Sequence, residues 1–345
     1  MTTNVLFDKV DQVFNSITDI KGLKVGHASN FNGYSGCTVI LCEDGAVCGL
    51  DIRGSASGTR QVDALSINHI VEQVHAILLS GGSSFGLDAA TGVTRYLEEK
   101  GVGFDVGLAK IPIVPSAVIF DILFGDPRVR PTPEMGYEAC LNAGENVEEG
   151  SIGAGTGATV GKLFEPSRAM KGGVGTSSIV MPDGLAVGAL VVVNAFGDII
   201  DNVTGRIIAG ARVSQDSLEF ANTVESIKKG AVKKQFGLVN TTLGVVATNG
   251  RFNKREITKV AQMAQGGLIK TISPVHTTFD GDLVFALSMG ECEADINLVG
   301  VLGEFVVAEA IKRAVKKADG FGIIPAFKDS AKGWKTVRVR EEGRA

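Results

Sequence analysis

The chain lacks several features that would assign it quickly to a class of protein. Its five cysteines form no Cys-x-x-Cys pair, and its four histidines show no His-x-x-x-His or His-Glu-x-x-His spacing. The first absence argues against a disulfide framework and favours reduced thiols in a reducing compartment. The second removes support for zinc catalysis. We therefore expect neither a metal nor a cofactor.

The chain also lacks a segment that would direct it to a membrane, to secretion or to nucleic acid. Residues 1–19 are polar and contain no apolar core of a signal peptide. No stretch approaches the ~20 apolar residues that span a bilayer. The net charge is −4 with no long basic run, which disfavours nucleic acid. These absences predict a cytoplasmic protein with no membrane partner and no nucleic-acid partner.

What the chain has in excess is glycine, with 45 glycines among 345 residues and only nine prolines. Glycine at this level without a collagen-like period indicates tight turns and close backbone approaches. Hydrophobic residues make up 44% and charged residues 21%. This balance is typical of a globular protein of enzyme size with a large core.

Apolar runs predict a chain in which strands dominate the middle and helices flank them. Residues 37–42 and 46–51 fit a hairpin, and residues 215–235 are the best linker candidate. The other predicted elements are strands at 71–79, 175–181, 185–193, 241–248 and 283–288, and helices at 87–100, 254–268 and 298–317. Few strands alternate with helices, which favours sheets stacked face to face over a doubly wound sheet.

Residues 153–162 form a glycine-rich segment that ends in Lys162. The segment fails the P-loop pattern, because Leu163 stands where Ser or Thr is required and Thr156 stands where Gly is required. It is either a plain tight loop or a loop packed so closely against an active centre that side chains are excluded. In the second case the loop delivers Lys162 into that centre.

Residues 82–86, Gly-Ser-Ser-Phe-Gly, match the Gly-x-Ser-x-Gly nucleophile elbow between a predicted strand and a predicted helix. Ser84 would be the nucleophile, with His276 as the histidine downstream of it. A glycine-rich chain meets this pattern easily by chance, and the alternating strands and helices of an α/β-hydrolase are missing. A serine hydrolase that uses Ser84 is a rival hypothesis, and the simpler interpretation is a turn that precedes a helix.

A polar step, Asn240-Thr241-Thr242, opens the apolar and β-branched run 243–248. The hydroxyl of Thr241 can be ordinary strand chemistry. It can also be a nucleophile that the chain exposes by cutting itself. A new N-terminal threonine would carry both the nucleophile and its own base, the α-amine.

Asp280 and Asp282 flank a glycine directly before another predicted strand. Alone, the three residues are most simply a turn. The carboxylates could also bind a cation, although the EF-hand pattern is absent, or orient the hydroxyl or ammonium group of a nucleophile.

Seven segments, taken in their order and spacing, resemble the DmpA-like aminopeptidase family, peptidase family S58. That family includes L-aminopeptidase/D-amidases, β-peptidyl aminopeptidases and the nylon-oligomer hydrolase. The segments are LLSGGSSFGLDAATGV (78–93), PSAVIFD (115–121), GAGTGATVGK (153–162), MKGGVGTSS (170–178), VVVNAFGDIID (191–201), NTTLGVVATN (240–249) and HTTFDGDLVFALS (276–288). The resemblance covers about Thr18 to Ala318, and it makes the elbow-like segment a loop of the family.

The resemblance implies one domain, residues 1–345, with a four-layer αββα sandwich similar to N-terminal nucleophile hydrolases. It implies that the chain cuts itself between Asn240 and Thr241. The fragments 1–240 and 241–345 would stay together because the strand that begins at Thr241 lies in a shared core. The resemblance further implies a small peptide or oligoamide substrate and a homo-oligomer, a tetramer of processed pairs.

Residue by residue, the resemblance makes Thr241 the nucleophile and places Lys162 and Asn194 near it. Asp280 and Asp282 match the two acidic partners in the nylon-oligomer hydrolase, whereas aminopeptidase members have Ser as nucleophile and a Ser-Gly-Glu version of the acidic pair. These positions are nearer to the nylon-hydrolase branch. In the implied mechanism the two carboxylates orient the hydroxyl and amine of the nucleophile, and the lysine favours the neutral amine.

The resemblance assigns Phe120, Gly81 and Gly82 to the substrate pocket. Family members with tyrosine at the position of Phe120 use its hydroxyl near the oxyanion, and phenylalanine cannot donate a hydrogen bond. Oxyanion stabilisation would then rest on the side-chain amide of Asn194 and on main-chain N–H groups.

Other functions stay open beside an amide hydrolase that forms an acyl ester on Thr241. One is a strict aminopeptidase, and another is an ornithine acetyltransferase-like acyl transferase, which also cuts itself before a threonine. A third is a binding protein that keeps the fold uncut. The shape of the pocket decides between exo and endo cleavage.

Overall fold

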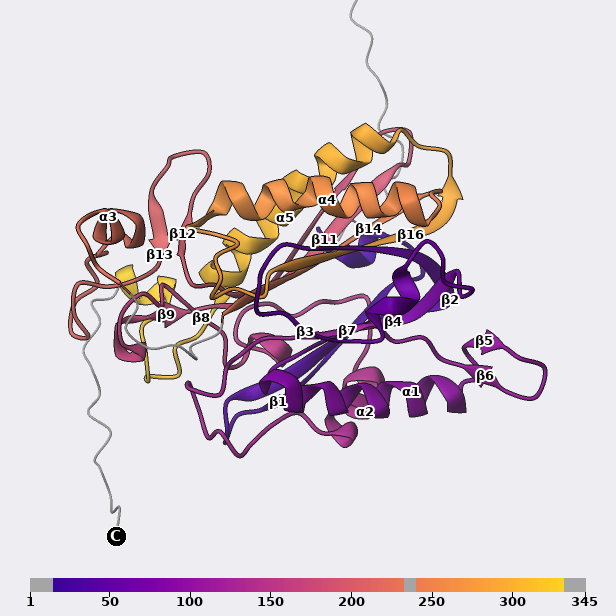
Figure 1. The fold of residues 1–345 in the computed structure, drawn as a ribbon, viewed down its shortest axis with the longest axis horizontal. Coiled ribbons are helices and arrows are strands. Elements are labelled where there is room, and N and C mark those ends of the chain that lie inside the picture. Colours follow the sequence, from indigo (N-terminus) through magenta and orange to yellow (C-terminus); the bar gives the residue numbers. More distant parts are fainter. Residues whose placement is uncertain (1–14, 233–239, 332–345) are drawn as a thin grey trace, which may run out of the picture.

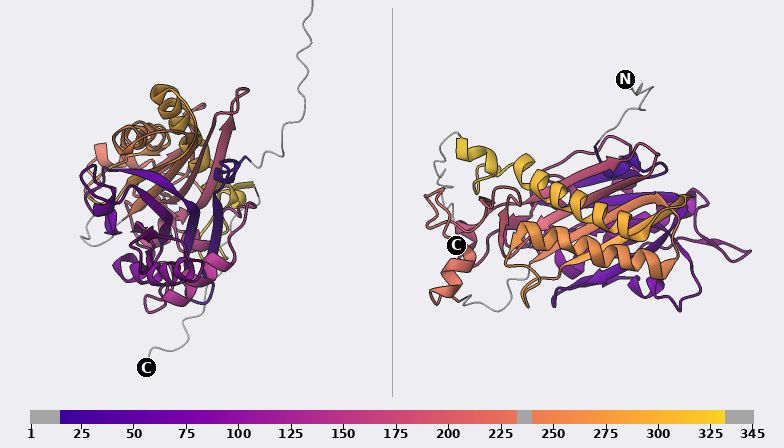
Figure 2. Two further views of the ribbon diagram at one scale, coloured as in Figure 1. Left: turned by 90° about the vertical axis from the view of Figure 1, so that its right-hand side faces the viewer. Right: turned by 90° about the horizontal axis from the view of Figure 1, so that it is seen from above.

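The computed structural model describes residues 15–232 and 240–331, and its elements stack in four layers (Figure 1). The helices α4 (Lys254–Thr271) and α5 (Ile296–Lys317) cover one side of the strands. The helices α1 (Ala89–Glu99) and α2 (Pro133–Leu141) cover the other side. Figure 2 shows α4 and α5 side by side across the outer face of the sheet. The order helix, sheet, sheet, helix confirms the αββα arrangement.

The strands between the helices form one hydrogen-bonded ladder that folds over into two layers. Its order is β10-β11-β14-β16-β2-β4-β7-β3, and β1 pairs with β2. The bounds of these strands are β1 (Lys24–Asn30), β2 (Ser35–Ile52), β3 (Gly58–Arg60), β4 (Gln73–Ser80), β7 (Ser116–Val118), β10 (Gly173–Val180), β11 (Ala186–Asn194), β14 (Thr241–Gly250) and β16 (Leu283–Cys292).

Shorter elements surround this ladder. They are the strands β5 (Phe104–Asp105), β6 (Lys110–Ile111), β8 (Thr159–Val160), β9 (Met170–Lys171), β12 (Asp198–Ile200), β13 (Ile207–Ala209) and β15 (Ile272–Ser273), the helix α3 (Thr223–Lys228), and the 3-10 turns Ile17–Asp19, Val62–Leu65, Ser83–Asp88, Gly153–Gly155, Pro166–Arg168 and Phe327–Ala331. The strands β8 and β9 pair with each other beside the glycine-rich segment.

Alternation along β14 divides its side chains between two apolar cores. Leu243 and Val245 belong to the core between the two sheet layers, and Val246 belongs to the core under α4 and α5. Successive side chains of a strand point to opposite faces. Thr241 is therefore on the face that looks between the sheets, and Thr242 is on the face that looks toward the helices.

Capping side chains set the starts of the two long helices. Asn253 accepts a hydrogen bond from the main-chain N–H of Glu256 and the carboxylate of Glu256 accepts one in return, a capping box that begins α4. Asp295 caps α5 by accepting from the N–H of Leu298. Both helices begin within two residues of the predicted positions.

The predicted hairpin of residues 37–42 and 46–51 is wrong. These residues form a single strand, β2, with a register shift against β4 between Leu41 and Ala46. The two halves of β2 have different partners, because residues 35–41 pair with β1 and residues 47–52 pair with β16. Continuing as one strand gives the main-chain groups of both halves hydrogen-bond partners.

The predicted linker, residues 215–235, is only partly an irregular segment. It contains the helix α3, which Asn222 caps by accepting from the N–H of Glu225. Residues 233–235 of the linker lie outside the described residues.

Candidate active site

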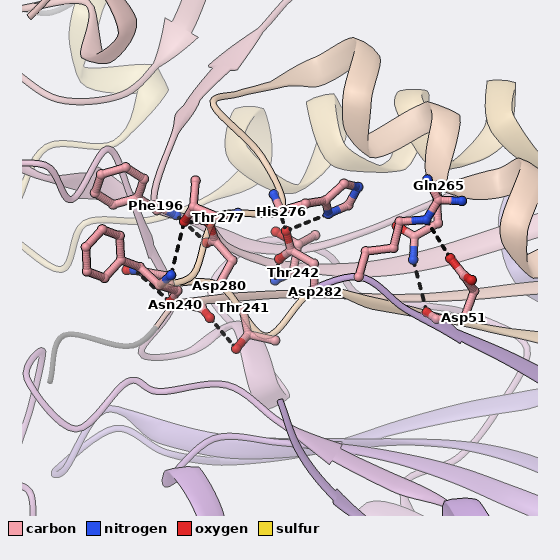
Figure 3. A network of polar contacts seen from close by, with 12 residues as sticks. Asp51, Phe196, Asn240, Thr241, Thr242, Gln265, His276, Thr277, Asp280 and Asp282 are labelled. Atoms are coloured by element: carbon pink, nitrogen blue, oxygen red, sulfur yellow. Dashed lines mark hydrogen bonds and ion pairs between the residues drawn. The ribbon is translucent and has the colours of Figure 1, made fainter. Parts of the chain in front are cut away.

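Three strand ends meet where β14 begins. The antiparallel pairing of β14 with β11 places Asn194 opposite Thr241. The pairing with β16 is parallel, and a further bridge places Asp280 beside Asn240. Parallel strands begin at the same edge of a sheet. The predicted nucleophile and the predicted acidic residues therefore converge, although they are far apart in the sequence (Figure 3).

The carbonyl oxygen of Asn240 receives two hydrogen bonds in the continuous chain. The hydroxyl of Thr241 donates to it at 2.5 Å, and the main-chain N–H of Gly281 donates to it at 2.7 Å. Asn240 and Thr241 are 0% and 2% exposed. An N–H group aimed at a carbonyl oxygen stabilises the charge that develops there when a nucleophile adds to the carbon. The bond between Asn240 and Thr241 thus has a hydroxyl and an oxyanion donor beside it.

Only glycine fits at position 281. A Cβ atom there would lie 2.8 Å from the hydroxyl oxygen of Thr241 and 2.7 Å from the carbonyl oxygen of Ala56. Both distances are below ordinary van der Waals contact, so a larger residue would displace one of these groups or Gly281 itself. The absence of a side chain lets the N–H of Gly281 approach the carbonyl of Asn240.

Asp280, which bridges to Asn240, accepts hydrogen bonds from both main-chain and side-chain donors. Its carboxylate accepts from the main-chain N–H of Phe196 at 3.1 Å, and from the N–H and hydroxyl of Thr277 at 3.2 and 2.5 Å. The pKa of Asp280 is raised to about 6, chiefly by burial and also by the charge of Asp282. The hydrogen bonds from Thr277 and Phe196 and the charge of Lys162 oppose this rise. Asp280 therefore titrates much nearer to neutral pH than an exposed carboxyl group does.

Asp282 links the residue after the nucleophile to a histidine. One carboxylate oxygen accepts from the main-chain N–H of Thr242 at 2.7 Å. The other accepts from the main-chain N–H and the Nδ1 of His276, both at 3.1 Å. In the continuous chain Asp282 thus holds the backbone directly after Thr241.

Lys162 and Asn194 are in direct contact. The Nζ of Lys162 donates to the side-chain oxygen of Asn194 at 2.7 Å and to its carbonyl oxygen at 2.9 Å. The side-chain amide of Asn194 donates to the carbonyl oxygen of Phe120 at 3.0 Å. An amide nitrogen carries two hydrogens, so this contact occupies one of them. The other hydrogen of this amide is not used by the contact with Phe120.

A second lysine fixes the glycine-rich segment that delivers Lys162. Lys171 is fully buried, and its Nζ donates to the carbonyl oxygens of Gly155 at 2.9 Å and Ala158 at 2.8 Å. Burial lowers the pKa of Lys171 to about 7. The next residue of the segment, Thr159, donates its N–H to the side-chain oxygen of Asn194 at 3.0 Å. The segment is thus packed against the candidate site, the second of its two predicted roles.

A cavity of about 230 Å³ opens beside Asn240. Its lining is largely apolar, with a few polar groups. The lining residues are Phe120, Asp121, Leu123, Phe124, Gly157, Thr159, Lys162, Phe164, Pro166, Ser167, Asn240, Ile323 and Ile324. Apolar walls with a few polar groups are typical of sites for small molecules.

Of the three predicted pocket residues, Phe120 lines the cavity, while Gly81 and Gly82 lie behind its wall. Gly82 donates its N–H to the carboxylate of Asp121 at 2.7 Å. A Cβ atom on Gly81 would lie 2.2 Å from the same carboxylate. The two glycines therefore shape the cavity through Asp121, which does line it.

The elbow-like turn, residues 82–86, exposes its serine, whereas Thr241 is buried. It follows β4 and precedes α1, as predicted, and Ser84 is exposed. The left-handed backbone belongs to Ser83, with φ +54°, and to Gly82. His276 contacts Asp282 instead. Among the hydrogen bonds of the described residues, none joins Ser84 to a histidine.

The described residues contain no group of three or more His, Cys, Asp or Glu side chains arranged to hold a metal ion. Within residues 15–232 and 240–331, no helix combines the length and apolar character needed to cross a bilayer. All five cysteines are free, and four of them are buried.

The sequence patterns missed the N–H of Gly281 and the side chain of Lys171, and they assigned His276 to Ser84, whereas it contacts Asp282. Gly281 and His276 lie within the segment HTTFDGD, and Lys171 lies within MKGGVGTSS. The only signal was therefore their place in segments that carry the resemblance. Their roles depend on which strand ends adjoin, and spacing along the chain does not reveal that.

Comparison with known proteins gives the chain a family and relatives. The sequence model of peptidase family S58 matches residues 15–321. An uncharacterized aminopeptidase of Mycobacterium leprae is 40% identical over 344 residues, covering 91% of this chain and 93% of the relative. A 6-aminohexanoate-oligomer endohydrolase of Kocuria sp. is 29% identical over 323 residues, covering 86% and 85%.

A solved structure has the same arrangement of elements. The L-aminopeptidase D-Ala-esterase/amidase of Ochrobactrum anthropi matches with a TM-score of 0.70 at 17% identity, covering 91% of this chain and 89% of that one. That protein is a variant of the Ntn-hydrolase fold. At this level of identity the likeness concerns the fold alone, and the four layers described above are of that kind.

Proposed function

The chain belongs to peptidase family S58, and from that premise we propose that it cuts itself before Thr241 and then uses this threonine as a nucleophile. It is a hydrolase of peptide or amide bonds. The proposed substrates are peptide-like or oligoamide bonds, such as those of nylon oligomers, and the proposed intermediate is an acyl ester on Thr241.

One observation carries the proposal: the carbonyl of Asn240 lies between the hydroxyl of Thr241 and the N–H of Gly281. The hydroxyl supplies a nucleophile next to the bond to be cut, and the N–H supplies a donor for the oxyanion. Both groups are buried, where such interactions are stronger than in water.

The first reaction is self-cleavage. The hydroxyl oxygen of Thr241 adds to the carbonyl carbon of Asn240, the carbon–nitrogen bond breaks, and the hydroxyl proton passes to the released amine. Water then hydrolyses the ester, which leaves a carboxylate on Asn240 and a free hydroxyl and α-amine on Thr241.

Turnover of a substrate repeats this chemistry with the α-amine of Thr241 as base. The reference pKa of an α-amine is about 7.7–8.0, and Lys162 nearby favours the neutral amine. The substrate carbonyl takes the place that the carbonyl of Asn240 holds before the cut. The N–H of Gly281, together with the amide of Asn194, then replaces the hydroxyl that Phe120 lacks.

The cavity beside Asn240 supports an apolar acyl group in the substrate. Asn240, the acyl residue of the first cut, lines the cavity together with Leu123, Phe164 and Ile323. A methylene chain or an apolar side chain removes its surface from water against such walls. This lining is compatible with an oligoamide and with an apolar peptide residue.

The proposal includes a cytoplasmic location, supported by five free cysteines. It also includes a homo-oligomer of processed pairs with no nucleic-acid or membrane partner. Size-exclusion chromatography with light scattering measures the assembly.

Intact-mass measurement and a denaturing gel test the proposal. The purified wild-type protein is expected as two fragments with the masses of residues 1–240 and 241–345, and the second begins Thr-Thr-Leu. A preparation that stays one chain and still hydrolyses amides would contradict self-cleavage.

Product analysis divides the alternatives. Oligoamides with blocked and free amino ends are compared, and cleavage of blocked oligomers excludes a strict aminopeptidase. An acetyl-donor assay separates an ornithine acetyltransferase-like transferase, which would pass the acyl group to an amine in place of water.

A further inference from the structure

The side chain of His276 contacts the acidic pair, Asp280 and Asp282, through Asp282. Its main-chain N–H and its Nδ1 both donate to the same oxygen of Asp282 at 3.1 Å. The other oxygen of Asp282 accepts the N–H of Thr242 at 2.7 Å (Figure 3). One carboxylate thus connects the histidine to the residue that follows the nucleophile.

The environment of His276 fixes its ring. The side chain is 15% exposed, and its backbone has φ +56°, in the left-handed region. An ionised carboxylate only accepts hydrogen bonds, so Nδ1 carries the proton. The other ring nitrogen, Nε2, is buried and has no hydrogen-bond partner within the described residues. The ring is therefore held by Asp282 alone among polar partners.

The contact with His276 lies on the Asp282 side of the acidic pair. Asp280 and Asp282 repel each other when both are ionised, and Lys162 acts on the side of Asp280. The nearby guanidinium of Arg53 is directed at Asp51, 2.8 Å away. Within residues 15–232 and 240–331, His276 is the side chain that hydrogen-bonds to Asp282, and a donor offsets the negative charge of a carboxylate.

We propose that His276 is a positioning residue for self-cleavage. It holds the carboxylate of Asp282 against the N–H of Thr242, which fixes the first residues of β14 with the hydroxyl of Thr241 on the carbonyl of Asn240. Asp280 takes up a proton as the pH falls through about 6. This inference rests on the proposed function, because it concerns the cut before Thr241.

Two variants, H276N and H276G, distinguish the effect of the hydrogen-bond donor at position 276 from the effect of the imidazole ring. Both residues tolerate the left-handed backbone found there. Asparagine places an N–H at the same number of bonds from Cβ as Nδ1 and does not titrate in this range, whereas glycine removes the donor without backbone strain. The full chain is made by cell-free synthesis, and intact mass follows its cleavage from about pH 5 to about pH 8. Thermal melting confirms that each variant folds.

The wild-type rate is expected to fall on the acidic side near the pKa of Asp280, about 6. In H276G the plateau rate falls about tenfold or more. The acidic limb moves up by about one pH unit, because the negative charge of Asp282, which raises the pKa of Asp280, is no longer offset by a hydrogen-bond donor. H276N retains the wild-type limb and most of the rate. A merely structural role would lower the rate of both variants without moving the limb.

Wild-type behaviour of H276G, or an H276N as slow as H276G, overturns the inference. If H276G does not fold, H276N alone tests the inference. A wild-type cleavage rate with the wild-type decline at acidic pH supports the donor role, and loss of cleavage in folded H276N refutes it. A wild-type chain that never cuts itself refutes the proposed function first, and the unmodified chain reveals that result before any variant is compared.

Discussion

Two hydroxyl residues are nominated as nucleophiles from the sequence, one on a turn and one at the start of a strand, and their surroundings differ. Ser84 is exposed on a turn built from one short segment. Thr241 is 2% exposed, and its hydroxyl contacts a carbonyl that the N–H of Gly281 also holds. The turn at Ser84 satisfies a local motif, whereas Thr241 lies where three strand ends meet. A motif becomes a site only where the fold adds the other groups that the chemistry needs.

The largest expected effect comes from removing each hydroxyl in turn. Thr241→Ala is expected to stay one chain and to lose all amide hydrolysis, because both reactions use this oxygen. Ser84→Ala is expected to cut itself and to hydrolyse amides at the wild-type rate. Gel, mass and activity measurements decide. The opposite pattern, loss with Ser84→Ala alone and no cutting in any protein, makes Ser84 the nucleophile.

Gly281→Ala tests whether the main-chain N–H of Gly281 is what distinguishes the surroundings of Thr241 from those of Ser84. A Cβ atom 2.8 Å from the hydroxyl of Thr241 pushes the N–H and the carbonyl of Asn240 apart. Loss of one oxyanion donor costs about 10²–10³ in rate, and the rate of self-cleavage is expected to fall by that much. Time courses after cell-free synthesis measure it.

The matched control for this variant is Gly144→Ala, since a Cβ atom on Gly144 meets nothing within 4 Å. It is expected to cut itself at the wild-type rate. Equal rates for the two alanine variants would remove Gly281 from the mechanism.

The titration of Asp280 gives the next largest effect, measured on stability in a Thr241→Ala background. Burial raises the pKa of Asp280 in the folded chain to about 6, above the unfolded value of about 3.9. The protonated carboxyl group of Asp280 contributes fully to the free energy of unfolding below about pH 4, and this contribution is lost as the pH rises through about 6. Asp280→Asn removes this loss. Relative to its parent, its free energy of unfolding is expected to rise by ~2–3 kcal/mol across this window.

Urea unfolding at a series of pH values measures that change. Asp126→Asn serves as the control, because Arg128 holds the pKa of Asp126 at about 2, outside the window. Its curve is expected to run parallel to that of the parent. A parallel curve for Asp280→Asn as well would show that the buried proton is held elsewhere.

The smallest expected effect is a gain. Phe120→Tyr adds the hydroxyl that some family members use near the oxyanion. If Gly281 and Asn194 already supply the donors, amide hydrolysis is expected to rise less than about tenfold. Steady-state kinetics on one oligoamide measure it. A rise of about 10² or more would mean that the wild-type site lacks a donor, and that Gly281 does not replace it.

Long apolar runs predicted their elements well, because burial on one or both faces leaves a clear period in the sequence. The strand at Thr241 and the helices at Lys254 and Ile296 are examples. The hairpin at residues 37–51 was predicted wrongly, because its turn-like residues 43–45 lie within a strand whose two halves have different partners.

The candidate site was predictable only as far as the resemblance reached. It named Thr241, Lys162, Asn194, Asp280 and Asp282, and the fold brings these residues together. The register between strands set the rest. The parallel alignment of β14 with β16 decides which N–H faces the carbonyl of Asn240 and which side chain contacts the acidic pair. Overall identity is higher to the mycobacterial aminopeptidase than to the endohydrolase.

The strands of the two proposed fragments are interleaved across the sheet. β14 and β16, from residues 241–345, lie between β11 and β2, both from residues 1–240. Neither fragment alone holds a complete sheet. A whole chain folds in a unimolecular reaction, whereas separated fragments must meet by diffusion, at a rate that falls with dilution. Under the proposed self-cleavage, the protein folds as one molecule before the cut. After the cut, the lifetime of the folded protein depends on how slowly it unfolds, because the separated fragments refold less readily.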